Sequence, residues 1–132
     1  TNISSIFIRG AVKNNPEQVI NLISEADELG DDAAAFSDFD YRLYHQLAFA
    51  SGNPIYALIL NGFQGLYTRM GRIYFAEKPT RDCTLNFYRQ LSELAARGEY
   101  EAVLPLVRQY GADSGTLWLT LKQSMSENLA EI

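Results

Sequence analysis

The sequence predicts an all-α domain, built as a single antiparallel bundle of six or seven helices. Apolar residues recur at three- and four-residue spacing along most of the chain. Gly and Pro stand between these segments, where helices end and begin, and no alternating apolar–polar run is bounded by a hairpin turn. The length of 132 residues, with 47% hydrophobic and 20% charged residues, is typical of one globular domain spanning residues 1–132.

The first 50 residues are expected to form three helices. Thr1 or Asn2 caps the first, which ends near residue 14. Pro16 suits the first turn of the second helix, which Gly30 stops. The third helix spans residues 32–50 and carries an apolar stripe that includes Phe36, Phe39, Leu43, Leu47 and Ala50.

The middle of the chain predicts one long helix over residues 54–75. Asn53 provides a cap and Pro54 the first helical position. This helix is apolar on several sides, so we expect it at the centre of the bundle. Gly62 and Gly65 inside it each cost about 1 kcal/mol relative to Ala, which predicts the close approach of a neighbour or a ligand.

Two or three helices complete the chain after a short loop. A fifth helix is expected over residues 81–97, and a sixth begins near Glu99. Pro105 lies inside the sixth and is expected to kink it, unless that helix starts later. The last helix either continues from the sixth or restarts near Ala112, and it ends near Ser126.

The composition excludes several classes of protein. Cys83 is the single cysteine, so neither an intrachain disulfide nor a zinc cluster built on cysteine pairs can form. It is interpreted as a small buried hydrophobe in a reducing compartment. Apolar runs such as residues 56–60 are too short to span a membrane, and the first nine residues do not have the pattern of a signal peptide. We therefore expect a cytoplasmic protein without a membrane segment.

The charge is unevenly distributed along the chain. The net charge of −5 divides into −6 over residues 1–40, +4 over residues 41–91 and −3 over residues 92–132. An acidic domain is a poor candidate for direct DNA binding, which depends on neutralising phosphates. The basic middle segment is either ordinary surface charge or a local site for an anionic ligand.

No catalytic pattern is recognisable, and we expect no enzyme activity. His45 is the single histidine, and no serine lies in a Gly-x-Ser-x-Gly context. One histidine excludes a histidine-rich metal site, although a carboxylate site from Asp38 and Asp40 remains open. Neither a Gly-rich phosphate loop nor a dinucleotide fingerprint is present.

One helical face stands out near the C-terminus. Gly111, Ser114, Gly115 and Trp118 fall at i, i+3, i+4 and i+7, and three of the four are small. Two glycines four apart loosen a helix, so either another helix packs tightly there or a long, thin ligand lies against it, flanked by Tyr110 and Trp118. Five tyrosines fall on or near the expected core faces, which makes a semi-polar cavity plausible: Tyr56, Tyr67, Tyr74, Tyr88 and Tyr110.

Six segments together resemble the effector domains of the FadR family, the fatty-acid-responsive members of the GntR superfamily of bacterial transcription regulators. The resemblance covers essentially the whole chain. The segments are Thr1–Ser4, Leu47–Tyr56, Leu58–Gly62, Gly65–Arg69, Tyr74–Ala76 and Tyr110–Trp118.

This resemblance implies an all-helical effector domain that lacks the N-terminal winged-helix domain of these regulators. The implied effector is long-chain acyl-coenzyme A, which shifts helices of the domain and releases DNA. DNA would be bound only through the N-terminal domain, and the intact regulators are dimers. They repress fatty-acid degradation genes and activate genes of unsaturated fatty-acid synthesis. No cofactor and no metal are implied.

The resemblance also implies a set of ligand-binding residues. They are Arg108, Tyr110, Gly111, Ser114 and Trp118 on one helix, and Tyr67, Arg69, Arg72 and Tyr74 on another. The small residues make room for the ligand, and Tyr67 and Tyr74 face the cavity. From their charge, the arginines at positions 69 and 72 are assigned to the phosphates of coenzyme A.

A sister group in the same superfamily provides the alternative function. Its effector domains bind a metal through an Asp and three His, with small carboxylates as ligands. Here Tyr41 holds the matching Asp position, next to Asp40, and tyrosines 88 and 110 stand where that group has histidines. His45 alone survives, which favours the acyl-CoA branch over a metal-dependent carboxylate sensor.

Overall fold

The structure, a computed structural model, describes residues 3–130, with side chains described up to residue 123. Within this range it is all-α and has no strand, which confirms the predicted fold class. The α-helices are α1 (Ile3–Asn14), α2 (Pro16–Ser24), α3 (Ala33–Ala50), α4 (Pro54–Asn61), α5 (Gln64–Tyr74), α6 (Lys78–Arg97) and α7 (Val103–Ala130). Short 3-10 helices, η1 (Glu25–Glu28) and η2 (Tyr100–Ala102), complete the described chain.

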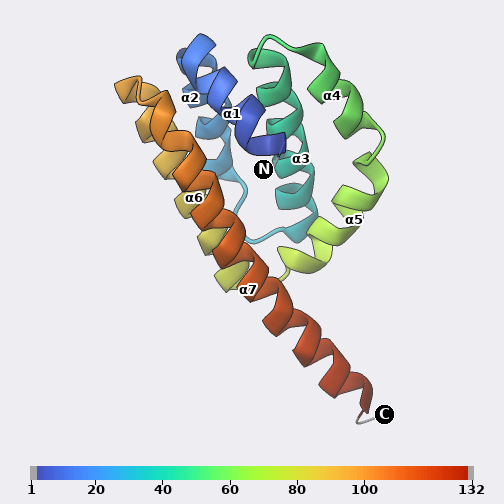
Figure 1. The fold of residues 1–132 in the computed structure, drawn as a ribbon. Helices are drawn as coiled ribbons and strands as arrows, with labels where there is room; N and C mark the ends of the chain where they lie inside the picture. The colour runs from blue at the N-terminus through green and yellow to red at the C-terminus, as the bar shows by residue number, and fades with distance from the viewer. Residues whose placement is uncertain (1–2, 131–132) are drawn as a thin grey trace.

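Helix α3 organises the bundle. It packs against α1, α2, α4 and α5, while α6 packs against α2 and α7, and α1 also contacts α7. In Figure 1, α4 and α5 lie on one side of α3, and α6 and α7 on the other. The C-terminal part of α7 extends beyond the rest of the bundle (Figure 1). The largest fully buried apolar side chains belong to Phe7, Ile8, Phe36, Leu47, Tyr88 and Leu91.

Several helix ends lie where the sequence predicts them. The Asp32 carboxylate accepts hydrogen bonds from the backbone N–H groups of Ala34 and Ala35 and so caps α3. Asn53 caps α4 in the same way, through a bond from the Ile55 N–H. Gly98 ends α6 with a φ of 69°, a conformation that favours glycine. The predicted cap of the first helix, Thr1 or Asn2, lies outside the described residues.

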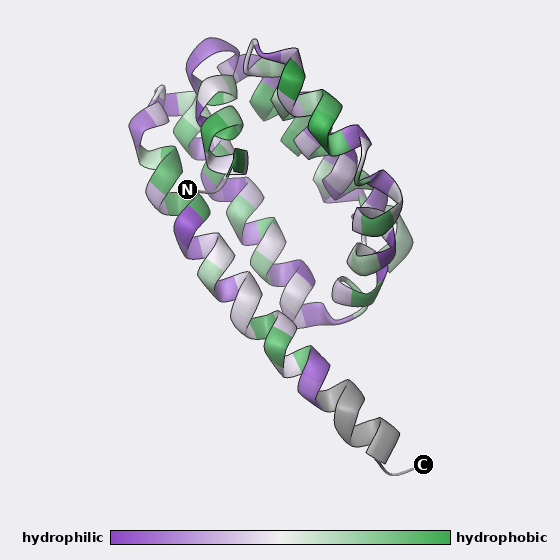
Figure 2. Ribbon diagram, turned by 45° about the vertical axis from the view of Figure 1, so that its right-hand side comes forward, coloured by the Kyte–Doolittle hydropathy of each residue, from purple (hydrophilic) through white to green (hydrophobic). Residues whose placement is uncertain are grey.

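The predicted long helix over residues 54–75 is wrong in two respects. The chain turns at Gly62 and Phe63, so that α4 and α5 are separate helices. They also lie at the periphery: Leu58 is 71% exposed and Phe63 55% exposed. The turn lets α5 fold back against α3, which a continuous helix in the direction of α4 could not do. Apolar residues are spread along both helices (Figure 2).

No neighbouring helix comes close to Gly62 or Gly65 among the described residues, and the approach of a ligand there stays a prediction. A Cβ added to Gly65 would meet no atom within 4 Å, and one on Gly62 would meet only a carbonyl oxygen of its own helix at 3.5 Å. At Gly71, in contrast, an added Cβ would come within 2.2 Å of the Ser37 Oγ atom. Gly71 therefore allows α5 to pack closely on α3.

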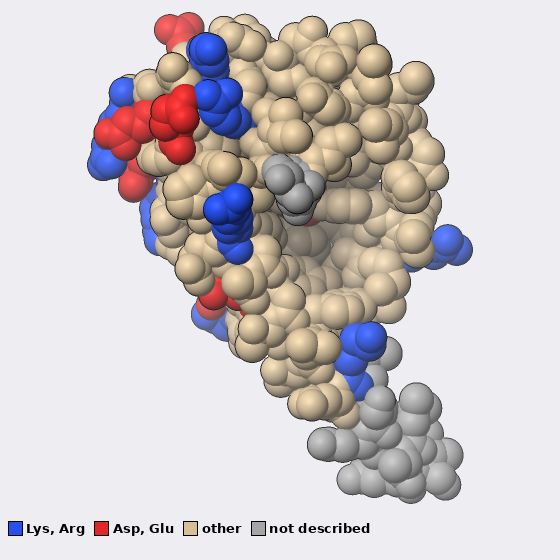
Figure 3. All heavy atoms as spheres, in the orientation of Figure 1, with Lys and Arg blue, Asp and Glu red and all other residues tan. Residues whose placement is uncertain are grey.

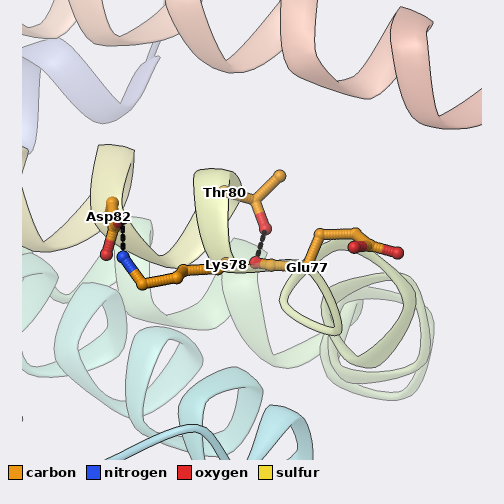
Figure 4. A network of polar contacts seen from close by, with 4 residues as sticks. All are labelled: Glu77, Lys78, Thr80 and Asp82. Atoms are coloured by element: carbon orange, nitrogen blue, oxygen red, sulfur yellow. Dashed lines mark hydrogen bonds and ion pairs between the residues drawn. The ribbon is translucent and has the colours of Figure 1, made fainter.

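The start of α6 differs slightly from the prediction. It begins at Lys78, three residues early, because side chains stabilise the connection from α5. The Thr80 hydroxyl donates to the carbonyl of Glu77 at 2.8 Å and also to that of Tyr74, and Lys78 pairs with Asp82 at 2.8 Å (Figure 4). The second predicted helix, in turn, changes to 3-10 geometry at Glu25 instead of remaining α-helical to Gly30.

Pro105 does not kink the final helix. Helix α7 starts at Val103, later than Glu99, so Pro105 lies in its first turn, where the missing N–H has no helical acceptor to lose. The helix then continues through Ala112 without a restart. It ends at Ala130 and not near Ser126. None of the helices in residues 3–130 has both the length and the apolar character needed to cross a bilayer.

Candidate functional site

A cavity of about 630 Å³ lies between α5 and α7, and α3 contributes Asp40 and Tyr44 to its lining. Figure 3 shows a hollow at the centre of this face, walled mostly by uncharged residues. Its volume falls within the range of small-molecule sites, about 300–1,000 Å³. The cavity brings together the two segments that the sequence analysis singled out.

The α7 wall carries the predicted small-residue face. Gly111, Ser114, Gly115 and Trp118 all line the cavity. A Cβ added to either glycine would meet no atom within 4 Å. No helix therefore packs tightly against these glycines among the described residues, and the space in front of them is open.

The α5 wall combines tyrosines with large apolar side chains. Tyr67 and Tyr74 both line the cavity, as predicted, beside Phe63, Leu66 and Met70. The Tyr74 hydroxyl hydrogen-bonds to the Ser114 hydroxyl at 2.7 Å, and the rings of Tyr74 and Trp118 are 6.1 Å apart. This hydrogen bond connects the two walls directly.

Tyr110 is held in place at the base of the α7 wall. Its hydroxyl lies 2.7 Å from the Thr84 hydroxyl on α6, and its ring stacks on Phe87 with centroids 4.2 Å apart. Burial raises the pKa of Tyr110 well above its usual value, so the hydroxyl stays protonated at neutral pH. Tyr110 is thus a fixed, neutral side chain among those that line the cavity.

Asp40 contributes a buried carboxylate to the cavity lining. It accepts hydrogen bonds from the Tyr67 hydroxyl at 2.6 Å and from the Tyr88 hydroxyl. No described Lys, Arg or His side chain forms an ion pair with it. Burial raises the pKa of Asp40 from 3.8 to about 6, against the lowering effect of the two hydrogen bonds.

The aspartate was missed as a cavity residue because the sequence analysis weighed it only as a metal ligand. A signal was nevertheless present. Phe36, Asp40 and Leu47 lie on the same apolar stripe of α3, and an acid within such a stripe faces the interior. Other lining residues that were not singled out are Ser4, Tyr44, Phe63, Leu66, Met70, Gly71, Phe75 and Val107.

The predicted arginines do not line the cavity. Arg69, Arg72 and Arg108 are exposed, and the Arg69 Nε donates to the Gly65 carbonyl at 3.2 Å. Arg42 of the basic middle segment lies 3.9 Å from Glu25, and the Lys and Arg side chains on the face shown in Figure 3 are scattered. The assignment of Arg69 and Arg72 to the coenzyme A phosphates, and of Arg108 to the ligand site, stays a prediction.

The arrangement does not fit the metal site of the sister group. Asp40 lines the cavity, whereas Tyr41 donates to the Leu60 carbonyl at 3.2 Å. His45 hydrogen-bonds with Asn61 at 2.8 Å and Asp38 is exposed. No group of three His, Cys, Asp or Glu residues close enough to hold a metal occurs among the described residues. Tyrosine hydroxyls surround the Asp40 carboxylate where metal ligation would need imidazoles.

Comparison with known proteins gives a consistent result. A model of the FadR C-terminal domain matches residues 1–130. The fatty acid metabolism regulator protein of Shewanella oneidensis is 47% identical over 131 residues, which are 99% of this chain and 55% of the relative. The protein of that name from Edwardsiella ictaluri is 48% identical over 131 residues, with the same coverage. The chain thus spans about half the length of these relatives.

Proposed function

The chain belongs to the FadR C-terminal domain family, and on that premise we propose that it senses long-chain acyl-CoA for a bacterial transcription regulator of fatty-acid metabolism. The observation that carries this proposal is the open space in front of Gly111 and Gly115. Together with the apolar α5 wall, it makes a slot that suits an extended hydrocarbon chain. Each CH₂ group buried there contributes about 0.8 kcal/mol, so long chains bind more tightly than short ones.

The site also supports a mechanism for signalling. An acyl chain lying between α5 and α7 competes for the space that the Tyr74–Ser114 hydrogen bond now crosses. Ligand binding therefore favours a conformation in which α7 is displaced relative to α5. In the intact, dimeric regulator, this conformation binds DNA less tightly, and the loss of DNA affinity is at most the ratio of the ligand's affinities for the two conformations.

Calorimetric titration with oleoyl-CoA below its micelle concentration tests the proposal. We expect binding close to one ligand per chain, with weak or no binding of free oleate or free coenzyme A. The recovered ligand should still be the intact thioester, since a thioesterase would hydrolyse it. Absence of oleoyl-CoA binding would contradict the proposal.

A pair of matched variants assigns binding to the cavity. Gly111→Leu fills the open space on α7 without meeting a neighbouring atom at Cβ, so the fold should survive while oleoyl-CoA affinity falls at least tenfold. Gly65→Leu, at an exposed glycine that is also free of contacts, is the control and should leave affinity unchanged. Equal affinity of both variants would place the ligand elsewhere.

Ser114→Asn and Trp118→Ala test the same face of α7 by changing two side chains that line the cavity. The larger amide at position 114 narrows the slot and replaces the hydroxyl partner of Tyr74. Loss of the indole at position 118 removes an apolar wall. Both variants should bind oleoyl-CoA more weakly and remain helical by circular dichroism. Unchanged affinity in both would contradict the assignment of this face.

A further inference from the structure

We propose that Asp40 couples ligand binding to proton uptake: an acyl chain fills the cavity only together with a proton on the Asp40 carboxylate. The inference rests on the proposed function of the cavity. It adds one residue, Asp40, whose protonation determines how ligand affinity depends on pH. It follows from the position of this one carboxylate.

Asp40 is the single carboxylate among the residues that line the cavity. The residue is 4% exposed, and each carboxylate oxygen accepts one tyrosine hydroxyl, one from Tyr67 and one from Tyr88. An ionised carboxylate has about four acceptor positions. Two of them accept no hydrogen bond from a described residue, and no described cation forms an ion pair with the carboxylate.

Filling the cavity with a hydrocarbon chain makes the ionised form of Asp40 less stable. A hydrocarbon chain displaces water and offers no donor, so the ionised form of Asp40 loses part of its remaining solvation. Burial of an unpaired charge is costly, and such a group becomes neutral instead. Because burial already raises the pKa of Asp40 to about 6 in the open cavity, closing off the remaining solvent with a hydrocarbon chain raises this pKa further.

The protonated form of Asp40 can form hydrogen bonds with the same two tyrosines. A protonated carboxyl can donate its O–H to the Tyr67 oxygen while its other oxygen continues to accept from Tyr88. Phenol hydroxyls both donate and accept, so the Tyr67 oxygen, the Tyr88 oxygen and both Asp40 carboxyl oxygens each keep one hydrogen-bond partner after proton uptake.

The other titratable groups around Asp40 do not compete for the proton. They are Tyr44 on α3, Tyr67 and Tyr74 on α5, Tyr88 on α6 and Tyr110 on α7. The pKa of each is raised from its usual value of 10, chiefly by burial. All five are neutral between pH 5 and pH 8. His45 hydrogen-bonds with Asn61 and does not line the cavity.

Calorimetry in two buffers of different ionisation enthalpy measures the proton directly. At pH 7.5 we expect the unmodified protein to take up close to one proton more per bound oleoyl-CoA than Asp40→Asn does. Its affinity should also weaken by up to about tenfold for each pH unit between 6 and 8, since one pKa unit corresponds to a tenfold change in equilibrium constant. Asp40→Asn should lack this component and bind more tightly than the unmodified protein at pH 8.

The comparison with Asp40→Asn also removes the contribution of the coenzyme A phosphate, which titrates near pH 6 in both proteins. Equal proton uptake in the two proteins would overturn the coupling and leave acyl-CoA binding intact. Absence of binding by the unmodified protein at every pH would instead overturn the proposed function and the coupling with it.

A second variant keeps the test independent of how well Asp40→Asn folds. Tyr67→Phe removes one donor to the Asp40 carboxylate and makes its ionised form less stable. The pH at which affinity begins to weaken should therefore move upward. An unchanged pH profile in Tyr67→Phe, together with no net proton uptake by the unmodified protein, would overturn the proposal.

Discussion

The core around α3 and the arm formed by α4 and α5 (residues 54–74) use apolar residues in opposite ways. In the core, Phe36 and Leu47 are completely buried. In the arm, the buried residues are Ala57, Gly71 and Tyr74, while Leu58, Phe63 and Leu66 are each more than half exposed. Similar hydrophobicity along the chain therefore gives two regions of very different packing.

This difference bears on how the cavity can open. Its α7 wall is backed by α6, where Tyr110 is stacked and hydrogen-bonded. Its α5 wall packs extensively on α3, with a hydrogen bond from Ser37 Oγ to the Thr68 carbonyl at 2.8 Å, but α3 is the only described element on which it packs extensively. Regions with few buried apolar contacts open more easily than the core. We therefore expect the arm to be the wall that moves when a ligand enters.

Leu47→Ala should have the largest effect on stability. Leu47 is fully buried in α3, and its truncation removes transfer free energy and leaves a void. We expect the free energy of unfolding to fall by about 2–5 kcal/mol, as measured by urea denaturation. A loss below about 1 kcal/mol would show that the core repacks freely and would weaken the contrast with the arm.

Asp40→Asn tests the point where the core meets the arm. In the folded protein the pKa of Asp40 is raised from 3.8 to about 6, so the folded state binds the proton more tightly than the unfolded state. The contribution of protonated Asp40 to the free energy of unfolding is fully present below about pH 4 and is lost as the pH rises to about 6. At neutral pH the loss corresponds to about 3 kcal/mol for a shift of this size.

The Asn side chain at position 40 carries no charge, so the Asp40→Asn variant does not lose unfolding free energy in this way as the pH rises. Relative to the unmodified protein, Asp40→Asn should gain up to about 3 kcal/mol of unfolding free energy above pH 6, and much less near pH 4. Urea denaturation at pH 4 and pH 7.5 measures the difference. The same difference at both pH values would show that the substitution acts through packing and not through the charge.

Gly71→Ala and Gly65→Ala should change stability in opposite directions, although both glycines lie in α5. A Cβ at position 71 would collide with Ser37, at 2.2 Å from Oγ and 2.9 Å from Cβ. Overpacking of this kind costs about 1–3 kcal/mol. At Gly65 nothing lies within 4 Å, so Ala should stabilise the helix by up to about 1 kcal/mol. Thermal unfolding of both variants gives the comparison; destabilisation by Gly65→Ala would contradict it.

Local signals predicted much of the fold and of the α7 wall. Asp32 and Gly98 have local reasons to end helices, and the spacing of Gly111, Ser114 and Trp118 places them on one face whatever surrounds them. The exposure of the arm could not be predicted in this way. A helix that is apolar on several sides has the same sequence pattern whether neighbours cover it or water does, and the break at Gly62 depends on how α5 packs on α3.

The site was predicted less completely than the fold for a similar reason. Tyr67, Tyr74 and Tyr110 line the cavity, because aromatic residues on inward faces share its walls. Arg69, Arg72 and Arg108 each lie two positions from one of these tyrosines but are exposed, since residues two apart on a helix do not share a face. The apolar stripe of α3 indicates that Asp40 faces the interior, but its hydrogen-bond partners could not be predicted, because Tyr67 and Tyr88 come from distant parts of the chain.

Leu58→Ser should have the smallest effect and tests the arm most directly. Leu58 is 71% exposed and does not line the cavity, so little apolar surface leaves water when the chain folds. Substitutions at such positions change unfolding free energy by less than about 0.5 kcal/mol, and oleoyl-CoA affinity should also stay constant. Urea denaturation at two protein concentrations measures the effect. A loss above about 1 kcal/mol that grows with concentration would mean that the outer face of the arm is buried by self-association in solution, and the contrast between arm and core would then belong to the isolated chain alone.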